Sequence, residues 1–186
     1  MNLSMLQKIA LAELYACAVA WFLPFFKARR RAAGQKKVVR ATASRWGIVL
    51  QSIGSLLIYP VGATKSVPSL VISMLLGPLS VALGWAAVRH LGKQWRFEAA
   101  LSEDHELIQT GPYRWIRHPI YASMLCLFLE VGSAWTWWPM LAAGLIVFLA
   151  GTEIRVRAED RLLAERFGDR FSAYHSRVHA YIPFVR

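Results

Sequence analysis

Apolar residues are gathered into five long runs, which polar and basic segments separate from one another. The runs cover residues 9–26, 46–63, 67–88, 119–134 and 137–154. A helix needs about 20 apolar residues to cross the hydrocarbon core of a bilayer, so the third run is long enough and the first two become so with their flanks. The last two runs are shorter and closely joined, which predicts a helical hairpin. No run alternates polar and apolar residues with a period of two, so strands are not expected.

This pattern predicts an all-α integral membrane protein with about five transmembrane helices in a single domain, 1–186. The composition agrees, because 56% of the residues are hydrophobic, more than in an ordinary soluble domain. Only Lys8 precedes the first run as a basic residue, and no Ala-x-Ala cleavage site follows closely. We therefore expect a retained helix and not a signal peptide.

The basic residues predict an orientation for this bundle. All but two of the 22 Lys and Arg residues, Lys8 and Lys65, lie in segments 27–45, 89–117 and 155–186. The positive-inside rule places these three segments in the cytoplasm, with the N-terminus and the Lys65 turn outside and the C-terminus inside. Topology and contacts with membrane lipids thus account for the net charge of +11, and no nucleic-acid partner is expected.

A few reactive side chains lie inside the apolar runs. Cys17 and Cys126 have neither zinc-ligand spacing nor a nearby histidine, so we expect no disulfide and no metal site. Glu13 and Glu130 could mark a cation path across the membrane, which keeps open a non-catalytic transporter or assembly subunit.

The first polar segment that could carry chemistry is 105–121, at the mouth of the fourth run. Pro119 suits the first turn of a helix, which puts His118 and Tyr121 three residues apart and able to face the same way. The N–H groups of that turn could bind a carboxylate. An alternative is that Arg114 and Arg117 are headgroup anchors and His118 is structural.

The second such segment, 153–168, continues the fifth run as a helix. Arg155 and Glu159 are four residues apart and share a face. Glu153 and Arg155 lie near the membrane boundary, where charged side chains are costly and often functional. A solvated helix with exposed salt bridges is the plainer alternative. Gly168 should end this helix, before a short amphipathic stretch with Phe171 and Tyr174.

Three spaced motifs resemble those of the isoprenylcysteine carboxyl methyltransferase family and its phospholipid methyltransferase relatives. The first reads His105-x-Leu107-Ile108-x-x-Gly111-x-Tyr113-x-x-x-Arg117-His118-Pro119-x-Tyr121. The second reads Arg155-x-x-x-Glu159-Asp160-x-x-Leu163-x-x-x-Phe167-Gly168-x-x-Phe171-x-x-Tyr174, and the chain ends in Arg177-Val-x-x-x-Ile-Pro183-Phe184. The resemblance covers about 84–186, whereas helices 1 and 2, at 9–63, match only in character.

The resemblance implies S-adenosylmethionine as cofactor and a lipid-like acceptor. Arg155 matches the acceptor-binding arginine of the family and is the expected catalytic and substrate-binding residue. The expected cofactor-binding residues are Glu98, His105, Glu106, Leu107, Ile108, Tyr113, His118, Pro119, Ile120, Tyr121 and Glu159. The chain departs from the family pattern at Asp160, where glutamate is usual, and at Phe171, where tyrosine is usual.

The expected reaction is O-methylation of the carboxylate of an isoprenylcysteine or a similar lipid-like acceptor at the cytoplasmic face. A carboxylate is already ionised at neutral pH and needs a cation to position it, which Arg155 offers. Phospholipid N-methylation is the alternative, with Glu13, Glu130 or Glu153 beside the amine. No obligate protein partner is evident from the sequence.

Overall fold

The computed structural model describes residues 3–32, 38–40, 42–58, 65–95, 100–102 and 106–182. These residues form six α-helices: α1 (Leu3–Ala32), α2 (Ser44–Leu57), α3 (Val67–Leu91), α4 (Pro119–Trp135), α5 (Trp138–Phe167) and α6 (Asp169–His175). They also form the 3-10 turns η1 (Gly92–Gln94) and η2 (Gly111–Arg114), and the strands β1 (Val38–Arg40) and β2 (Ala100–Ser102).

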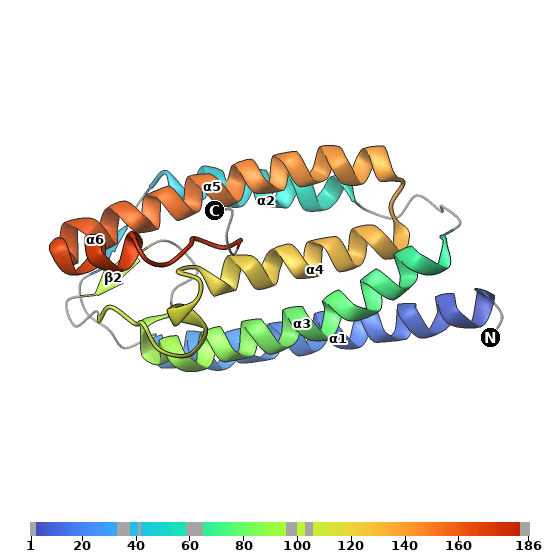
Figure 1. Ribbon diagram of the computed structural model, residues 1–186, viewed down its shortest axis with the longest axis horizontal. Coiled ribbons are helices and arrows are strands. Elements are labelled where there is room, and N and C mark those ends of the chain that lie inside the picture. Colours follow the sequence, from blue (N-terminus) through green and yellow to red (C-terminus); the bar gives the residue numbers. More distant parts are fainter. Residues whose placement is uncertain are drawn as a thin grey trace.

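The five long helices run side by side, with α4 in the middle of the bundle (Figure 1). Helix α3 packs against α4 on one side and α1 on the other, whereas α2 packs mainly against α5. The predicted hairpin of α4 and α5 exists as a connection, but each of its helices makes its main contacts with a helix from the first half of the chain. The second half of the chain therefore depends on the first for its packing.

Three helices are long and apolar enough to cross a membrane: α1 over Leu3–Arg29, α3 and α5. Helix α4 is apolar but has 17 residues, and α2 has 14. The described residues thus contain five bundle helices where five spans were expected. Three of these helices have the length of a membrane span. This architecture supports an integral membrane protein.

Proline and glycine set several helix boundaries. Pro119 occupies the first turn of α4, as expected, because its missing N–H costs nothing there. Gly168 ends α5 with a φ of 50°, a conformation that a side chain disfavours, and α6 begins directly after it. The predicted helical extension through 153–168 and the break at Gly168 are confirmed.

Close backbone contact joins α2 to α5. A Cβ atom added at Gly54 would lie 2.7 Å from the Gly144 carbonyl oxygen, and one added at Gly151 would lie 2.6 Å from the Gly47 carbonyl oxygen. Glycines seven residues apart on each helix therefore face each other in antiparallel order. Small residues at such positions let helices approach closely enough for dispersion contacts and polar side chains to hold them together.

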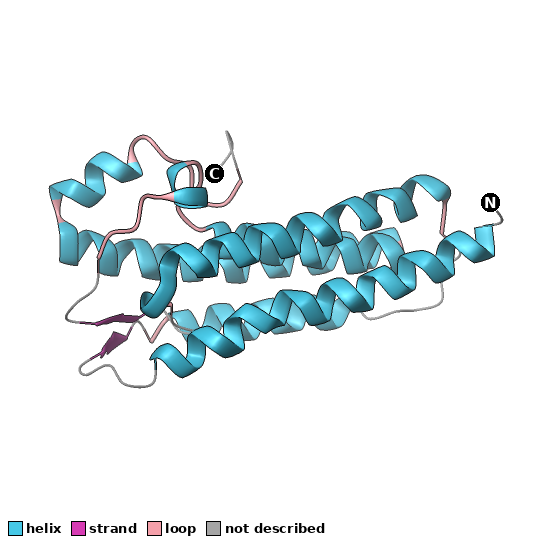
Figure 2. Ribbon diagram, turned by 90° about the horizontal axis from the view of Figure 1, so that it is seen from below, coloured by secondary structure: helices cyan, strands magenta, loops and turns pink. Residues whose placement is uncertain are grey.

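The two ends of the bundle differ in character. Strands β1 and β2 and helix α6 gather at the end opposite the N-terminus (Figure 2). At the other end, Lys65 donates a hydrogen bond to the Thr136 carbonyl beside the α4–α5 turn, where Trp137 and Trp138 are exposed. The segments predicted to share one side of a membrane thus include elements that share one end of the bundle.

The expectation that strands are absent is wrong at one place. β1 pairs with β2 in antiparallel register, with Val39 opposite Leu101. Each strand has three residues, too few for a period-of-two pattern to appear in the sequence.

Candidate functional site

The segment before α4 is fixed by the C-terminal part of the chain. Ile116 and His179 form a parallel bridge, the Arg117 N–H donates to the His179 carbonyl at 2.8 Å, and the His118 N–H donates to the Ala180 carbonyl at 2.7 Å. These backbone bonds hold His118 at the start of α4. The N–H groups of Tyr121 and Ala122 donate to the His118 carbonyl, so they are not available to an incoming carboxylate.

His118 lies between two carboxylates of α5. Its Nε2 is 2.9 Å from Asp160 Oδ1, and its Nδ1 is 3.2 Å from Glu159 Oε2. The imidazole is buried, whereas the Glu159 side chain is 27% exposed. His118 therefore orients Glu159 from its buried side, and the carboxylate stays partly exposed to a ligand.

Opposing effects act on the protonation of His118. Burial lowers the pKa of the imidazole, but the hydrogen bonds and negative charges of Asp160 and Glu159 raise it more, to about 9. At neutral pH the ring is thus an imidazolium that donates one N–H hydrogen bond to each carboxylate. One cation fixes the orientation of two adjacent acids.

Tyr121 connects Glu159 to Arg155. The Tyr121 hydroxyl donates to Glu159 Oε1, and the Arg155 guanidinium carbon lies 4.9 Å from the centre of the Tyr121 ring. The expected sharing of a face by Arg155 and Glu159 is confirmed, since both contact the same aromatic residue. A cation and an anion are thereby both held against one tyrosine.

Arg155 is buried, and α2 supports it. Its Nη1 donates to Gln51 Oε1 at 2.9 Å, and Gln51 Nε2 donates to Thr152 Oγ1 at 2.9 Å. A Cβ atom at Gly47 would lie 2.4 Å from Arg155 Cγ, so the glycine makes room for the arginine side chain. No sequence motif pointed to Gln51, because its role depends on a contact between residues 104 positions apart.

Arg117 is a clamp and not a headgroup anchor. Its guanidinium lies 3.1 Å from Asp160 Oδ2 and also donates to the carbonyls of His175 and Val178, with the whole residue only 6% exposed. It therefore ties α5 to the segment that follows α6. Arg117 belongs to the resemblance motif, which is the signal that could have identified it. Arg114 is exposed beside Trp115 and keeps the character of an anchor.

Tyr113 is the other predicted cofactor residue close to Glu159. Burial raises the pKa of its phenol, and the Glu159 charge raises it further. The Tyr113 carbonyl accepts a hydrogen bond from the Tyr174 hydroxyl at 2.5 Å, which docks α6 on η2. The predicted amphipathic stretch after Gly168 is thus confirmed, with Phe171 and Tyr174 buried.

The remaining predicted residues have mixed surroundings. The Glu106 N–H donates to Gln94 Oε1 at 3.0 Å, while Leu107 and Ile108 are half-buried. Pro119 is fully buried, and Ile120 packs against the cluster of Ala28, Val88 and Trp95. Glu98 and His105 lie outside the described residues. The structure therefore brings together His118, Tyr121, Glu159 and Arg155, with Tyr113 beside them.

An open hollow of about 430 Å³ lies next to this group, between α5 and α6. It is lined by Arg157, Asp160, Arg161, Ala164, Phe171, Ser172 and His175. Of the residues that line the hollow, Asp160 is the one that also bonds to His118. The chemistry of the site is therefore assigned to the charged group and not to the hollow.

The donor set fits a cofactor with a cationic centre. Glu159 offers a partly exposed carboxylate whose position two other side chains fix. Tyr121 and Tyr113 are buried aromatic residues beside it. These are the chemical needs of S-adenosylmethionine, which carries a sulfonium, an amino-acid group and an adenine ring.

Three curated relatives share part of their sequence with this chain. The "Uncharacterized protein YpbQ" of Bacillus subtilis is 30% identical over 95 residues, which are 48% of this chain and 56% of the relative. Yeast "Protein-S-isoprenylcysteine O-methyltransferase" is 30% identical over 84 residues, 44% of this chain and 34% of the relative.

The name of a third relative gives methanethiol, and not an isoprenylcysteine, as the acceptor. "Methanethiol S-methyltransferase 1" of Bradyrhizobium diazoefficiens is 35% identical over 78 residues, 40% of this chain and 25% of the relative. The chain thus spans from a quarter to just over half of the length of these relatives.

Residues 71–165 match the family described as "Isoprenylcysteine carboxyl methyltransferase (ICMT) family". This stretch covers about half of the chain. It includes α4 and most of α3 and α5, with His118, Tyr121, Arg155 and Glu159. The resemblance that the motifs indicated is confirmed: the chain belongs to the isoprenylcysteine carboxyl methyltransferase family.

Proposed function

We propose that this protein is an S-adenosylmethionine-dependent methyltransferase that O-methylates the carboxylate of an isoprenylcysteine or a similar lipid-like acceptor. The observation that carries the proposal is the placement of Arg155 and Glu159 around Tyr121. The same tyrosine contacts a cation suited to a carboxylate and an anion suited to a sulfonium. We further propose that this site faces the cytoplasm.

On the cofactor side, Glu159 is the residue that would meet the positive charge. When bound, S-adenosylmethionine supplies an electrophilic methyl group. His118 and Tyr121 keep the Glu159 carboxylate in one orientation, since each of its oxygens has a partner. Tyr113, Leu107 and Ile108 would contact the uncharged parts of the cofactor, and Glu106, Pro119 and Ile120 would shape the wall around it. Glu98 and His105 remain predictions on sequence grounds.

On the acceptor side, Arg155 would bind the carboxylate. A guanidinium can offer two parallel N–H donors to the two oxygens of a carboxylate. Its anchoring by Gln51 limits the loss of side-chain freedom on binding. Because the carboxylate has a reference pKa of about 4, it is ionised at neutral pH and needs no general base. Arg155 therefore contributes placement, and the apolar tail of the acceptor would lie against the bundle from the bilayer.

Phospholipid N-methylation is less well supported by the geometry. A protonated amine needs a carboxylate beside it to remove a proton. Glu130 lies nine residues after Tyr121 on α4, which is roughly 14 Å along a helix. Glu153 is engaged with Arg157 at 2.7 Å. These acids are not placed to serve an acceptor at Arg155.

A transfer assay with labelled S-adenosylmethionine tests the proposal. The purified chain, in lipid nanodiscs, is given a farnesylcysteine acid, phosphatidylethanolamine or a fatty acid. We expect transfer to the farnesylcysteine acid, abolished by Arg155→Ala while the affinity for S-adenosylmethionine stays within about threefold, because the proposal assigns the arginine to the acceptor and Glu159 to the cofactor. Arg157→Ala is the matched control, since Arg157 lies on the same helix, is exposed and pairs with Glu153.

Two results would count against this assignment. Transfer to phosphatidylethanolamine alone would select the N-methyltransferase alternative. An equal loss of cofactor affinity and transfer in Arg155→Ala would remove the division between the acceptor and cofactor sides.

A further inference from the structure

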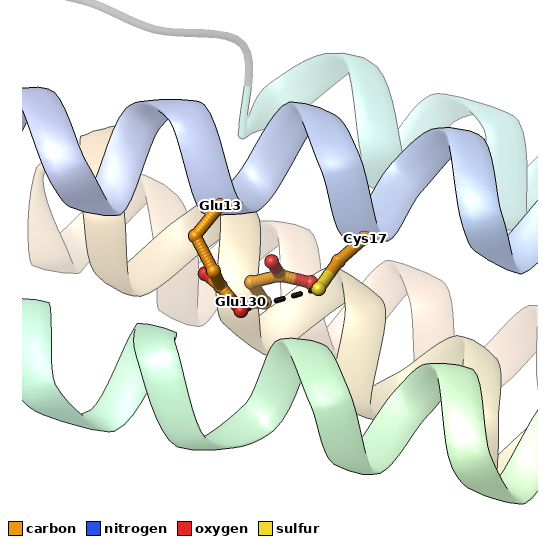
Figure 3. Close-up of side chains that lie close together, drawn as sticks. All are labelled: Glu13, Cys17 and Glu130. Carbon is orange, nitrogen blue, oxygen red and sulfur yellow. Dashed lines mark hydrogen bonds between the residues drawn. The ribbon is translucent and has the colours of Figure 1, made fainter.

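A second group of reactive side chains lies in the interior of the bundle, away from the site described above. Glu13 and Cys17 are one turn apart on α1 and point toward Glu130 of α4 (Figure 3). Ligand atoms of the three residues all lie within 4.8 Å of one another. The Cys17 thiol donates to Glu13 Oε1 at 3.1 Å. The group therefore presents two carboxylates and one sulfur to a common point.

Glu130 is the unusual member of the group. The residue is 0% exposed, and neither of its carboxylate oxygens has a hydrogen-bond partner among the described residues. Glu13 Oε2 is also buried without a partner there. An ionised carboxylate that is buried and unpaired costs several kcal/mol or more, so such groups are protonated, paired or bound to a metal. A positively charged ligand would stabilise the ionised form of both acids.

Helix α3 makes room for the two carboxylates at a glycine. A Cβ atom added at Gly77 would lie 2.5 Å from Glu13 Oε1 and 2.5 Å from Glu130 Oε1. The carboxylates of both acids thus point toward the same glycine of α3. Pro78 follows directly, and because proline has no N–H, the Met74 carbonyl loses its usual partner within the helix. Helix α3 therefore lacks one backbone hydrogen bond at the level of the two acids.

We propose that Glu13, Cys17 and Glu130 form a binding site for a divalent cation of the Zn²⁺ class. Thiolate and carboxylate together are ligands for zinc, and three protein ligands leave a fourth position open. Ca²⁺ and Mg²⁺ prefer six or more oxygen ligands, which this group does not supply. A divalent cation offsets the two carboxylate charges that the bundle interior otherwise leaves uncompensated.

Sequence spacing alone did not indicate this site. Glu13 and Cys17 have the i, i+4 spacing of a helix face, but the third ligand is on another helix. Because Cys17 must lose its proton to bind zinc as a thiolate, binding releases that proton to solvent and weakens as the pH falls. The site does not depend on methyl transfer, and a failure of the proposed function would leave it standing.

Metal binding to the full chain in nanodiscs tests the proposal. Zn²⁺ affinity is measured by competition with a chromophoric chelator, and Co²⁺ is used as a spectroscopic substitute. We expect one Zn²⁺ per chain and a thiolate-to-cobalt charge-transfer band. Glu130→Gln and Cys17→Ser should each weaken Zn²⁺ binding by about tenfold or more, and Cys17→Ser should remove the band.

Cys126→Ser is the matched control, because Cys126 is the other cysteine, lies one turn before Glu130 on α4 and is outside the ligand group. It should keep both the affinity and the band. The absence of Zn²⁺ binding by the folded wild-type chain would overturn the proposal. So would a charge-transfer band that Cys126→Ser removes and Cys17→Ser keeps. If Cys17→Ser or Glu130→Gln fails to fold, the cobalt spectrum of Cys126→Ser still decides the assignment, because a thiolate band in that variant can come only from Cys17, the other cysteine of the sequence.

Discussion

At the scale of single residues, His118 shows how burial and charge compete. The imidazole is buried, which disfavours its charge, yet the two carboxylates of α5 stabilise the charged form. The ring bonds to both acids at once, and no neutral tautomer can donate to both. His118 is therefore best understood as a positioning residue that acts through Glu159, with direct contact to the cofactor remaining a prediction.

The raised pKa of His118 predicts a pH-dependent stability. The folded-state pKa of about 9 lies above the value of 6.5 for an unperturbed histidine. The stabilisation is thus complete below pH 6.5 and is lost as the pH rises through 9. In that window the free energy of unfolding should fall by about 1.4 kcal/mol per pH unit at most. Thermal unfolding in detergent should show this decline in the wild type and a weaker one in His118→Gln.

His175→Gln is the control for this experiment. His175 also approaches Asp160, at 3.7 Å, but its side chain is 48% exposed. Most of the pH dependence between 6.5 and 9 should therefore survive this substitution. If His118→Gln kept the full decline, another group would have to be responsible.

The sequence predicted the main site residues better than their supports. His118, Tyr121, Arg155 and Glu159 carry motif spacing and helical periodicity, and the structure brings them together. Gln51 could not be predicted, because its contact with Arg155 joins helices that are distant in the sequence. Local pattern reports which residues share a face, whereas the partner of that face is decided by packing.

At the scale of helices, the α2–α5 contact links stability to the site. The paired glycines bring the two backbones together, and the same contact carries Gln51 to Arg155. The sequence located both helices but not their pairing, since the α4–α5 hairpin was the neighbour relation that chain connectivity favoured. Helix α2, expected to reach the length of a span with its flanks, has 14 residues, whereas α5, expected to be short, has 30.

Filling one of these glycine positions should weaken the bundle. In Gly54→Ala the new methyl would lie 2.7 Å from the Gly144 carbonyl oxygen and 2.8 Å from the Phe148 nitrogen, which are backbone atoms that cannot rotate away. We expect a loss of about 1–3 kcal/mol, the usual cost of overpacking. The apparent Tm in detergent measures it.

Ser52→Ala provides the comparison on the same helix. Ser52 is exposed and its hydroxyl donates to the Ile48 carbonyl of the same helix, so its removal should change stability by about 0.5 kcal/mol or less. Equal Tm values for the two variants would show that α2 and α5 can separate at no cost.

At the scale of the whole molecule, the two ends of the bundle have different chemistry. Helix α6 and the strands share one end, whereas Lys65 and the exposed tryptophans share the other. The positive-inside rule, applied to the sequence, puts the first end in the cytoplasm. The structure fixes which segments share an end, and the direction relative to a membrane remains a prediction.

Cysteine labelling would determine that direction. Starting from a chain with Cys17→Ser and Cys126→Ser, either Arg177→Cys or Val67→Cys is introduced, at positions that are exposed at opposite ends. A membrane-impermeant maleimide should label Val67→Cys in intact cells and Arg177→Cys only in inverted vesicles. The reverse pattern would invert the orientation, and labelling of both positions from one side would contradict the bundle as a membrane-spanning unit.

The clamp of Arg117 also has a consequence for the order of synthesis. Arg117 and Asp160 meet beneath carbonyl groups of residues 175 and 178, and the bonds that seat His118 come from residues 179 and 180. All of these acceptors are translated after the helices that they lock. A ribosome-bound chain can form helices α1 to α5 while the contacts of Arg117 and His118 with residues 175–180 are still missing. On the proposed function, methyl transfer begins only once the final segment has emerged and docked, so membrane insertion and activation are separate events in time.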